Sequence, residues 1–392
     1  MVFFKLYWQK VLENSDKIEN VNNGNYSLTK LNKKMEGDTL PDLAWYRSVV
    51  WEKVGGAPMD KTDAWTPVCV SPAKAWESQD MLTFDPTEVD IEDFVEGTMV
   101  NVFVSRQNPV PQIATRSSIG ATGTFFSKRS FAELFMDALK AEKKELTAEQ
   151  FPLEDGDCAR FWSFVLRHPD NRFVEPIPKP SLVLVHMGSV NSDGIISICQ
   201  RPENQGWQLP MKYSIDTQIT AEAVKMVLED QGAIRGPTWQ GLVVRMSDGN
   251  RLKFVRTAYS RLRNWRTESR QDIRLLWLVR ENSDIIAEYM SHFPEDMGRF
   301  LQLNRMVLRI VRELYSEYQE VHIRHNKKLE GAKDYYRPHV FILHTQYLNV
   351  LKPKGWFVRA KEVREYIYGL PWQRLNYIIQ RIEGTVSAPG SS

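Results

Sequence analysis

The sequence predicts an α+β protein in which antiparallel sheets are followed by an all-helical C-terminal domain. Between residues 41 and 268, short runs of β-branched and aromatic residues alternate with turn residues, which is typical of strands. Two helical segments interrupt these runs. Between residues 269 and 392, apolar residues recur at spacings of three and four, which is the period of helices with one apolar face.

Residues 45–51, 98–104 and 182–185 show the strand pattern most clearly. The clearest pairing is between residues 241–246 and 252–255, which are joined by Ser-Asp-Gly-Asn. Asp-Gly favours the positive φ angles of a tight turn. We therefore expect these two runs to form an antiparallel hairpin.

Residues 131–139 and 221–231 have the pattern of helices within the sheet region. In the C-terminal domain, one helical face is expected from Leu303, Met306, Val307, Ile310, Val311, Leu314 and Tyr315. Further helices are expected at about residues 337–351 and 360–382. Such apolar stripes are more often core than binding groove, so we expect them to pack against one another.

The N-terminal 40 residues differ from the rest in composition. They are polar after the first dozen and contain Asn-Val-Asn-Asn-Gly-Asn at positions 20–25. A segment with few apolar residues buries too little surface to offset the entropy of ordering. We therefore expect residues 1–40 to form a loosely ordered arm.

Composition limits the classes of function. The length of 392 residues indicates two domains, and a net charge of +2 gives no general attraction to nucleic acid, so any basic surface must be local. The three cysteines lie far apart, without metal-ligand spacing, as is typical of reduced thiols. No apolar run is long enough to cross a bilayer. We expect an intracellular protein, in the cytoplasm, nucleus or a virion, with no membrane partner and no metal site.

Four segments carry the most specific sequence signal. They are residues 71–76 (Ser-Pro-Ala-Lys-Ala-Trp), residues 96–103 followed by 114–120, residues 161–172, and residues 239–245 followed by 252–259. Each is a weak signal alone. Together, their order and approximate spacing resemble the ATP-dependent RNA ligases of phages and large DNA viruses, within the covalent nucleotidyltransferase superfamily. The resemblance covers about residues 45–265.

This resemblance implies a nucleotidyltransferase fold and a defined chemistry. In the family, a lysine attacks the α-phosphorus of ATP and forms a lysyl-AMP. Carboxylates in the third and fourth segments hold metal or ribose, and paired lysines in the last segment neutralise the α-phosphate.

The chain departs from the family at the catalytic positions. Phe94 stands where the Lys-x-Asp-Gly motif has its nucleophilic lysine, and a benzyl group cannot attack phosphorus. Val165 and Gln240 stand where the family has two glutamates, and Val255 replaces the second of the paired lysines. The sequence therefore predicts a degenerate member of the family without catalytic residues. We expect Phe94 and Val165 to fill the former pocket.

Other positions match the family and are interpreted as the remnant of a nucleotide and phosphate site. They are Glu96, which stands in for the aspartate, and Arg116, Arg172, Lys253 and Arg256. Without the missing carboxylates a metal has few ligands. We therefore expect weak binding of ATP and Mg²⁺ or none, and predict no cofactor.

A second cationic pattern runs through the end of the sheet region. It comprises Arg251, Tyr259, Arg261, Arg263, Trp265 and Arg266. Cations interleaved with aromatic rings are typical of a strip that binds RNA or other single-stranded nucleic acid. The alternative is that the strip combines phosphate-site relics with a solvated linker face, and the sequence leaves both open. His322 and His325 are one helical turn apart, but no third ligand is near, so we expect a surface pair.

The preferred interpretation is a catalytically inactive RNA-ligase-like protein that serves as a structural or interaction module. Its partners would be other proteins of a larger assembly, such as the virion or capsid of a large DNA virus. One alternative is an active ATP-dependent RNA ligase or repair enzyme with a displaced nucleophile, for which Lys53, Lys61 and Lys74 are the candidates. Another is an RNA-binding accessory subunit that uses the basic strip.

Overall fold

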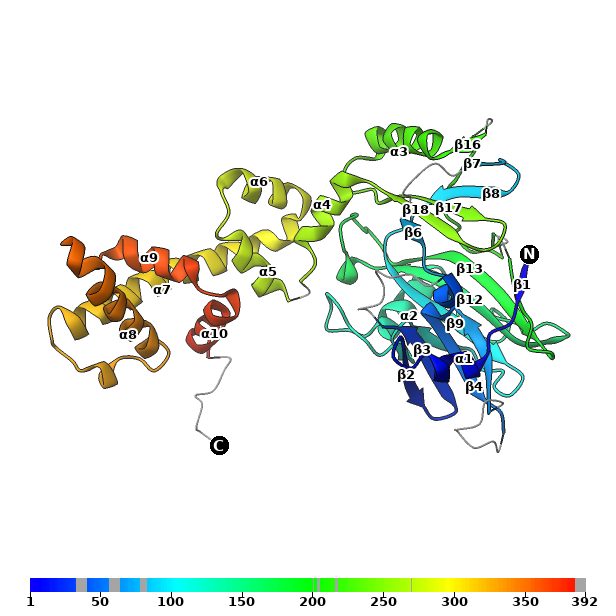
Figure 1. The fold of residues 1–392 in the computed structure, drawn as a ribbon, viewed down its shortest axis with the longest axis horizontal. Helices are drawn as coiled ribbons and strands as arrows, with labels where there is room; N and C mark the ends of the chain where they lie inside the picture. The colour runs from blue at the N-terminus through cyan, green and yellow to red at the C-terminus, as the bar shows by residue number, and fades with distance from the viewer. Residues whose placement is uncertain are drawn as a thin grey trace. The chain divides into compact units, whose positions relative to one another are not determined.

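The computed structural model describes residues 1–32, 41–55, 64–77, 83–199, 201–202, 205–215, 218–268 and 270–384. The chain forms two compact units, Met1–Asn264 and Trp265–Ser392 (Figure 1). Antiparallel sheets dominate the first unit and helices the second, so the predicted α+β fold class is confirmed. The division falls between Asn264 and Trp265, whereas the sequence placed it after residue 268.

The largest sheet forms the centre of the first unit. Among the described residues it has seven strands, in the order β1 (Val2–Phe4), β14 (Ile196–Ile198), β13 (Ser181–Asn191), β12 (Asp157–Arg167), β9 (Thr98–Ser105), β10 (Gln112–Thr115) and β11 (Ser118–Ile119). Strands β9, β12 and β13 are long antiparallel neighbours. The predicted strands at 98–104 and 182–185 lie within them.

The two faces of this sheet bury different cores because successive side chains of a strand point to opposite sides. Val100, Val102 and Val104 of β9 pack with the helix α2 (Phe131–Ala141), while Phe103 contributes to the core on the other face. Helix α2 begins where Ser130 and Glu133 form a reciprocal capping box. The predicted helix at 131–139 is therefore confirmed.

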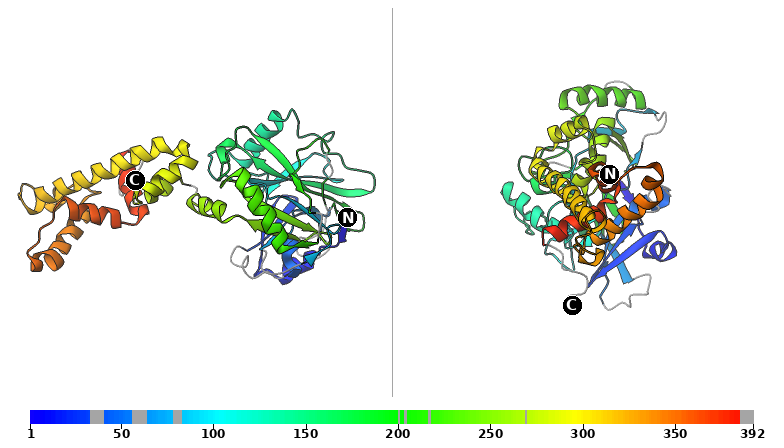
Figure 2. Two further views of the ribbon diagram at one scale, coloured as in Figure 1. Left: turned by 90° about the horizontal axis from the view of Figure 1, so that it is seen from above. Right: turned by 90° about the vertical axis from the view of Figure 1, so that its left-hand side faces the viewer.

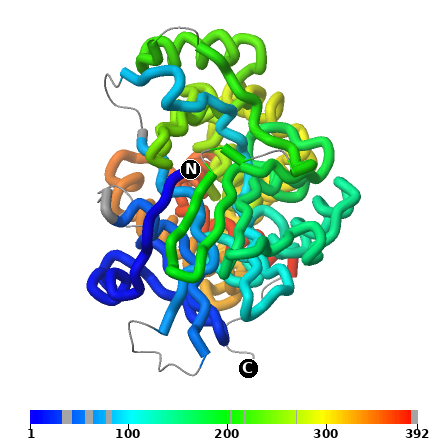
Figure 3. The backbone as a smooth tube through the Cα atoms, turned by 90° about the vertical axis from the view of Figure 1, so that its right-hand side faces the viewer, coloured from blue at the N-terminus to red at the C-terminus, as the bar shows by residue number. Residues whose placement is uncertain are grey.

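A second sheet has the described strands β2 (Ile18–Asn23), β3 (Tyr26–Leu31), β4 (Ser48–Lys53) and β5 (Trp65–Val70). The 3₁₀ helix Pro41–Arg47 precedes β4, so the strand predicted at 45–51 begins later than expected. Figure 3 shows the first strand, β1, running beside the hairpin of β13 and β14.

The prediction of a loosely ordered arm is wrong for residues 1–32; residues 33–40 lie outside the described residues. Residues 1–32 supply β1, the helix α1 (Trp8–Glu13), β2 and β3. Their side chains that are buried in the core among β4, β5, β9 and β12 include Leu6, Trp8, Val11, Ile18 and Leu28. A few apolar residues at the right positions are enough, because neighbouring strands provide the surface that buries them.

The third sheet carries the polar face on which the candidate site is built. Its described strands are, in order, β15 (Lys212–Tyr213), β8 (Val89–Asp93), β17 (Gly241–Met246), β18 (Arg251–Val255) and β6 (Trp76–Glu77). The predicted hairpin of β17 and β18 is confirmed. A separate pair, β7 (Thr83–Phe84) and β16 (Ile219–Thr220), leads into the helix α3 (Ala221–Arg235).

Helix α3 covers one face of this third sheet. Val224 and Leu228 of α3 pack against Leu242, Val244 and Phe254 of the hairpin. Because side chains alternate along strands, the residues between these apolar positions face the opposite side. The helix α4 (Thr257–Trp265) follows the hairpin directly.

The second unit is helical throughout its described elements. They include α5 (Gln271–Leu278), α6 (Ser283–His292), α7 (Met297–His322), α8 (Arg337–Gln346), the π-helical turn Tyr347–Leu351, α9 (Ala360–Gly369) and α10 (Trp372–Ile382). Figure 2 shows α7 as the long helix along which the others lie. Leu303, Val307, Ile310, Val311 and Leu314 are buried, so the predicted apolar face of α7 is confirmed. No helix among the described residues has the length and hydropathy needed to cross a bilayer.

Candidate functional site

A cavity of about 720 Å³ lies within the first unit. Its walls come from the polar face of the β8–β17–β18 sheet, from the connection between β8 and β9, and from β12 and β13 of the large sheet. Val95, Met99, Val165, Val185 and Val243 give it an apolar floor. This volume is in the range of small-ligand sites.

Basic side chains dominate the charged lining. Among the described residues, the cavity is lined by Arg47, Lys74, Arg116, Arg245, Arg251, Lys253 and Arg263. The acidic side chains in the same lining are Glu92, Asp93 and Glu96. The lining therefore has a local excess of positive charge that the near-neutral whole chain does not reveal.

Two of these cations are buried directly opposite each other in the hairpin. Arg245 of β17 pairs with Arg251 of β18, and the residues are only 5% and 7% exposed. Arg245 donates from Nε to Glu92 of β8 and from Nη2 to the carbonyl of Val185. Like charges opposite each other in a sheet repel, and Glu92 offsets this repulsion on the Arg245 side.

Arg251 has no carboxylate partner among the described residues. Its Nη2 donates to the carbonyl oxygen of Ala73 at 2.6 Å, and its Nε is buried without an acceptor. Burial, with Arg245 and Arg47 nearby, holds the pKa of Arg251 well below its ordinary value. A guanidinium in this environment gains from any anion that enters the cavity.

The cavity's three carboxylates are engaged in structural contacts. Glu92 holds Arg245, and Asp93 accepts from Arg235 (2.7 Å), Tyr213 (2.7 Å) and the Trp239 indole (3.2 Å). Glu96 accepts the backbone N–H groups of Val174 (2.5 Å) and Glu175 (2.7 Å). Burial raises the pKa of Glu96 to about 7, against the lowering effect of these two N–H groups.

ATP-dependent ligation requires a divalent cation such as Mg²⁺. Whether the cavity could hold one depends on the contacts that its carboxylates already make. Mg²⁺ needs carboxylate oxygens that can turn toward it. Each acidic group here already holds an arginine or the backbone through at least one oxygen, and the surrounding lining is cationic. Oε2 of Glu92 is buried without a hydrogen-bond donor, but one oxygen beside two arginines is too few ligands for Mg²⁺. No cluster of three or more His, Cys, Asp or Glu residues suited to a metal occurs in the described part of the chain. The residues present do not fit a resident Mg²⁺.

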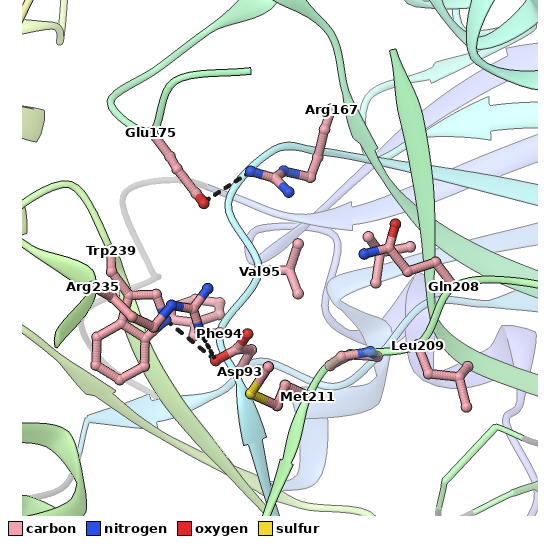
Figure 4. A pocket seen from close by; sticks show the side chains of 12 residues that line it. Asp93, Phe94, Val95, Arg167, Glu175, Gln208, Leu209, Met211, Arg235 and Trp239 are labelled. Carbon is pink, nitrogen blue, oxygen red and sulfur yellow. Dashed lines mark hydrogen bonds and ion pairs between the residues drawn. The ribbon is translucent and has the colours of Figure 1, made fainter. Parts of the chain in front are cut away.

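Asp93, Phe94 and Val95 line both this cavity and a second, smaller one of about 340 Å³. Figure 4 shows this second cavity, with Val95 between the ion pairs Arg235–Asp93 and Arg167–Glu175. The backbone N–H of Phe94 donates to the carbonyl of Gly241 at 2.8 Å, which fixes the segment after β8 to the hairpin. The position at which the resemblance implies a nucleophile therefore lies at the cavity and carries a phenyl ring.

The other substituted positions lie nearby. Val165 and Gln240 line the large cavity, whereas Val255 is not among its described lining residues and lies opposite Gly241 in the hairpin. The expectation that Phe94 and Val165 fill the former pocket is wrong, since a large cavity is present beside both. Val165 instead packs with Val183 and Val185 into the floor.

The predicted phosphate-site remnants divide into two groups. Glu96, Arg116 and Lys253 line the cavity. Arg172 and Arg256 are not among its described lining residues. Arg172 folds back onto the carbonyl of Val174, and Arg256 donates to the carbonyl of Gly236 at the end of α3.

The predicted basic strip does not form one surface. Arg251, Tyr259 and Arg263 line the cavity, and Arg263 lies 4.0 Å from the Phe173 ring centroid. Arg261 is exposed on α4. Trp265 and Arg266 belong to the second unit, where Arg266 is buried against Asp296. Side chains alternate between the two faces of a strand and rotate around a helix, so residues that are close in sequence point in different directions.

The three lysines considered as a displaced nucleophile differ in whether they line the cavity. Lys74 lines the cavity, Lys53 ends strand β4 and is not among the described lining residues, and Lys61 lies outside the described residues. Of the two histidines considered for metal, His322 stacks on His344, with ring centroids 3.7 Å apart, rather than pairing with His325.

Sequence reasoning missed Arg47, Glu92 and Arg245 as cavity residues. A signal for one of them, Arg245, was present in the hairpin. Arg245, Arg251 and Lys253 alternate with the apolar residues Val244, Leu252 and Phe254. The pattern therefore predicts a cationic face, although it does not say what lies opposite.

Comparison with known proteins gives structural matches only. No protein-family model matches the chain, and a search of curated proteins finds no match. Among solved structures, an archaeal ATP-dependent RNA ligase aligns in its form 1 with a TM-score of 0.40 and 11% identity, covering 97% of this chain and 80% of that chain. Form 2 gives 0.39 and 11%, covering 97% and 95%.

A putative ATP-dependent DNA ligase from Aquifex aeolicus aligns with a TM-score of 0.37 and 11% identity, covering 96% of this chain and 79% of that chain. The chain thus has a low-identity structural similarity to ATP-dependent RNA and DNA ligases.

Proposed function

We propose that this protein is a non-catalytic, RNA-ligase-like module that binds a phosphate-bearing ligand in its basic cavity. The observation that carries the proposal is the combination of Phe94 with seven basic side chains in the described lining of one cavity. Electrostatic attraction of a phosphate needs only cations near the surface it occupies. Covalent adenylation needs one amine at one position, and the side chain there is phenyl.

The role that follows is structural or interactive, within a larger protein assembly such as a virus particle. The protein would recognise a nucleotide or nucleic-acid phosphate without transferring it. A second candidate function is an RNA ligase with a displaced nucleophile. It is supported by Lys74, an amine that lines the cavity. An RNA-binding accessory role has less support, because the residues of the basic strip do not share one surface.

Two measurements test the proposal on the full-length protein. The first is incubation with α-labelled ATP and Mg²⁺ or Mn²⁺, followed by a denaturing gel and intact mass. We expect no covalent adduct. An adduct that peptide mapping assigns to Lys74 would establish the displaced-nucleophile enzyme instead.

The second is titration with tripolyphosphate and ATP by calorimetry. We expect saturable binding that weakens at least tenfold in Lys74→Gln/Lys253→Gln and falls with added salt. Lys140→Gln, a matched change of an exposed lysine on α2, should leave binding unchanged. Failure of both ligands to bind the folded protein would overturn the phosphate-binding part of the proposal.

A further inference from the structure

The C-terminal unit exposes apolar and cationic side chains along α8, the turns that follow it and the start of α9. Its exposed apolar members are Phe341, Ile342, Leu348, Val350, Trp356 and Phe357. Its exposed cations are Lys352 and Lys354, with Arg359 and Lys361, which pair with Glu362 (2.8 Å) and Glu365 (3.8 Å). We call these residues the α8–α9 surface. Large apolar side chains gathered on an exposed surface mark an interaction site.

The backbone around this surface is well anchored. The π-helical turn Tyr347–Leu351 continues α8, and Gly355 reverses the chain at a φ of 71°. Leu351 and Val358 are buried on either side of the turn, whereas Trp356 and Phe357 are 55% and 68% exposed. The two aromatic rings therefore project from a turn that is held at both ends.

The charge of the segment has one sign. No aspartate or glutamate occurs between Asp334 and Glu362, while the segment contains Lys352, Lys354 and Lys361. The Lys354 ammonium lies 5.4 Å from the Trp356 ring centroid, so cation and ring sit together. Neither Lys352 nor Lys354 has a carboxylate at ion-pair distance in the described part of the chain. An anionic partner is the electrostatic complement of this surface.

We propose, in contrast to the expectation from the sequence of no membrane partner, that the α8–α9 surface docks onto an anionic phospholipid bilayer. Projecting Trp and Phe side chains enter the interfacial region, while lysines on long stems reach the lipid phosphates. Single-stranded nucleic acid is a poorer fit, because Ile342, Leu348 and Val350 offer no ring on which a base can stack. The inference does not rest on the basic cavity of the first unit, since it uses none of its residues.

Co-sedimentation of the full-length protein with vesicles tests the proposal. We expect binding to vesicles of phosphatidylserine and phosphatidylcholine, and little binding to phosphatidylcholine alone. Trp356→Ser/Phe357→Ser should weaken binding at least tenfold. Lys352→Gln/Lys354→Gln should weaken it about thirtyfold, at the typical contribution of each lysine near an anionic surface.

Met226→Ser/Ile234→Ser is the matched control, because it removes two exposed apolar side chains from α3 instead. It should bind as the unchanged protein does. Because every substituted side chain is exposed, circular dichroism should show the same helix content in all variants.

Binding that ignores phosphatidylserine, or that survives in both surface variants, would overturn the proposal. So would surface-dependent binding of a single-stranded oligoribonucleotide by protein that ignores vesicles, which would assign the surface to nucleic acid. Self-association that disappears in the surface variants, with no vesicle binding, would assign it to a second copy of the chain.

Discussion

Two walls of the large cavity differ in what they offer a ligand. The connection between β8 and β9 presents the apolar side chains Phe94 and Val95, and its Glu96 carboxylate is turned to the backbone of residues 174–175. The β17–β18 hairpin presents Arg245, Arg251 and Lys253. One wall is lined by a phenyl ring and an aliphatic side chain, and the other by three cations. The apolar and the cationic parts of the lining therefore belong to separate structural elements.

We expect the largest loss of stability when Glu92, the carboxylate that pairs with Arg245 of the hairpin, is neutralised. Glu92→Gln keeps the shape of the side chain but leaves buried Arg245 without a carboxylate, beside buried Arg251. Removing one partner of a buried ion pair costs about 3–5 kcal/mol. Thermal and urea unfolding of the first unit should show this loss.

Asp90→Asn is the control on the same strand, because Asp90 pairs with the half-exposed Lys212. Its cost should stay below about 1 kcal/mol. Equal losses in the two variants would mean that the hairpin cations need no internal counter-charge.

The next largest loss of stability is expected at Gly97, in the connection between β8 and β9 that forms the opposite wall. In Gly97→Ala, the new Cβ would lie 2.4 Å from the carbonyl oxygen of Leu166 and 2.6 Å from Cγ1 of Val165. Such overpacking costs about 1–3 kcal/mol and should push the Phe94 segment away from β12. Unfolding of the variant measures the cost.

Adding Val165→Ala should not restore the stability of Gly97→Ala, because the contact with the Leu166 carbonyl remains. Gly123→Ala is the control, since its Cβ would meet the Phe131 ring only at 3.6 Å. Full rescue by Val165→Ala would show that the side-chain contact alone requires glycine at position 97.

A binding comparison sharpens the contrast between the walls. Lys253→Gln should weaken tripolyphosphate binding about tenfold, which is the loss of roughly one charge-assisted contact. Phe94→Ala should change the affinity by less than about threefold, since the ring carries no charge. Calorimetric titration of both variants would contradict this division if Phe94→Ala had the larger effect.

A last comparison is the pH dependence of stability at Glu96. Its pKa in the folded protein is raised to about 7 by burial, above the ordinary 4.5. The stability tied to protonated Glu96 is therefore fully present below pH 4.5 and is lost as the pH rises through 7. Glu96→Gln should flatten the stability profile in this window, relative to the unchanged protein.

The exposed Glu149→Gln should leave that profile unchanged. Thermal melts of the three proteins between pH 4.5 and 7 provide the measurement. A Glu96→Gln profile as steep as the original would place the titration on another group.

Local patterns predicted local structure well. Asp248-Gly249 between two apolar runs was enough to predict the β17–β18 hairpin, because turn chemistry and strand alternation are both encoded within a few residues. The apolar spacing of α7 predicted its buried face for the same reason. Composition was a poor guide for residues 1–32, because pairing with β4 and β14 orders strands that could not be stable alone.

Phe94 lines the cavity because it directly follows strand β8, which pairs with the hairpin strand β17. The expectation of a filled pocket failed because cavity volume depends on the distance between sheets, which no single side chain sets. The basic strip dispersed for a related reason. Residues 251–266 cross from a strand to a helix and then into the second unit, so their side chains point to different neighbours.

The sequence by itself determined the α+β class, the hairpin, the helical C-terminal unit and the absence of an amine at position 94, since each depends on residues close together in the chain. Only the tertiary structure decided that Arg47, Lys74, Arg116, Arg245 and Lys253 line one cavity and that its three carboxylates are already engaged. Coulomb interactions depend on distances in space, and those distances exist only after the sheets have packed.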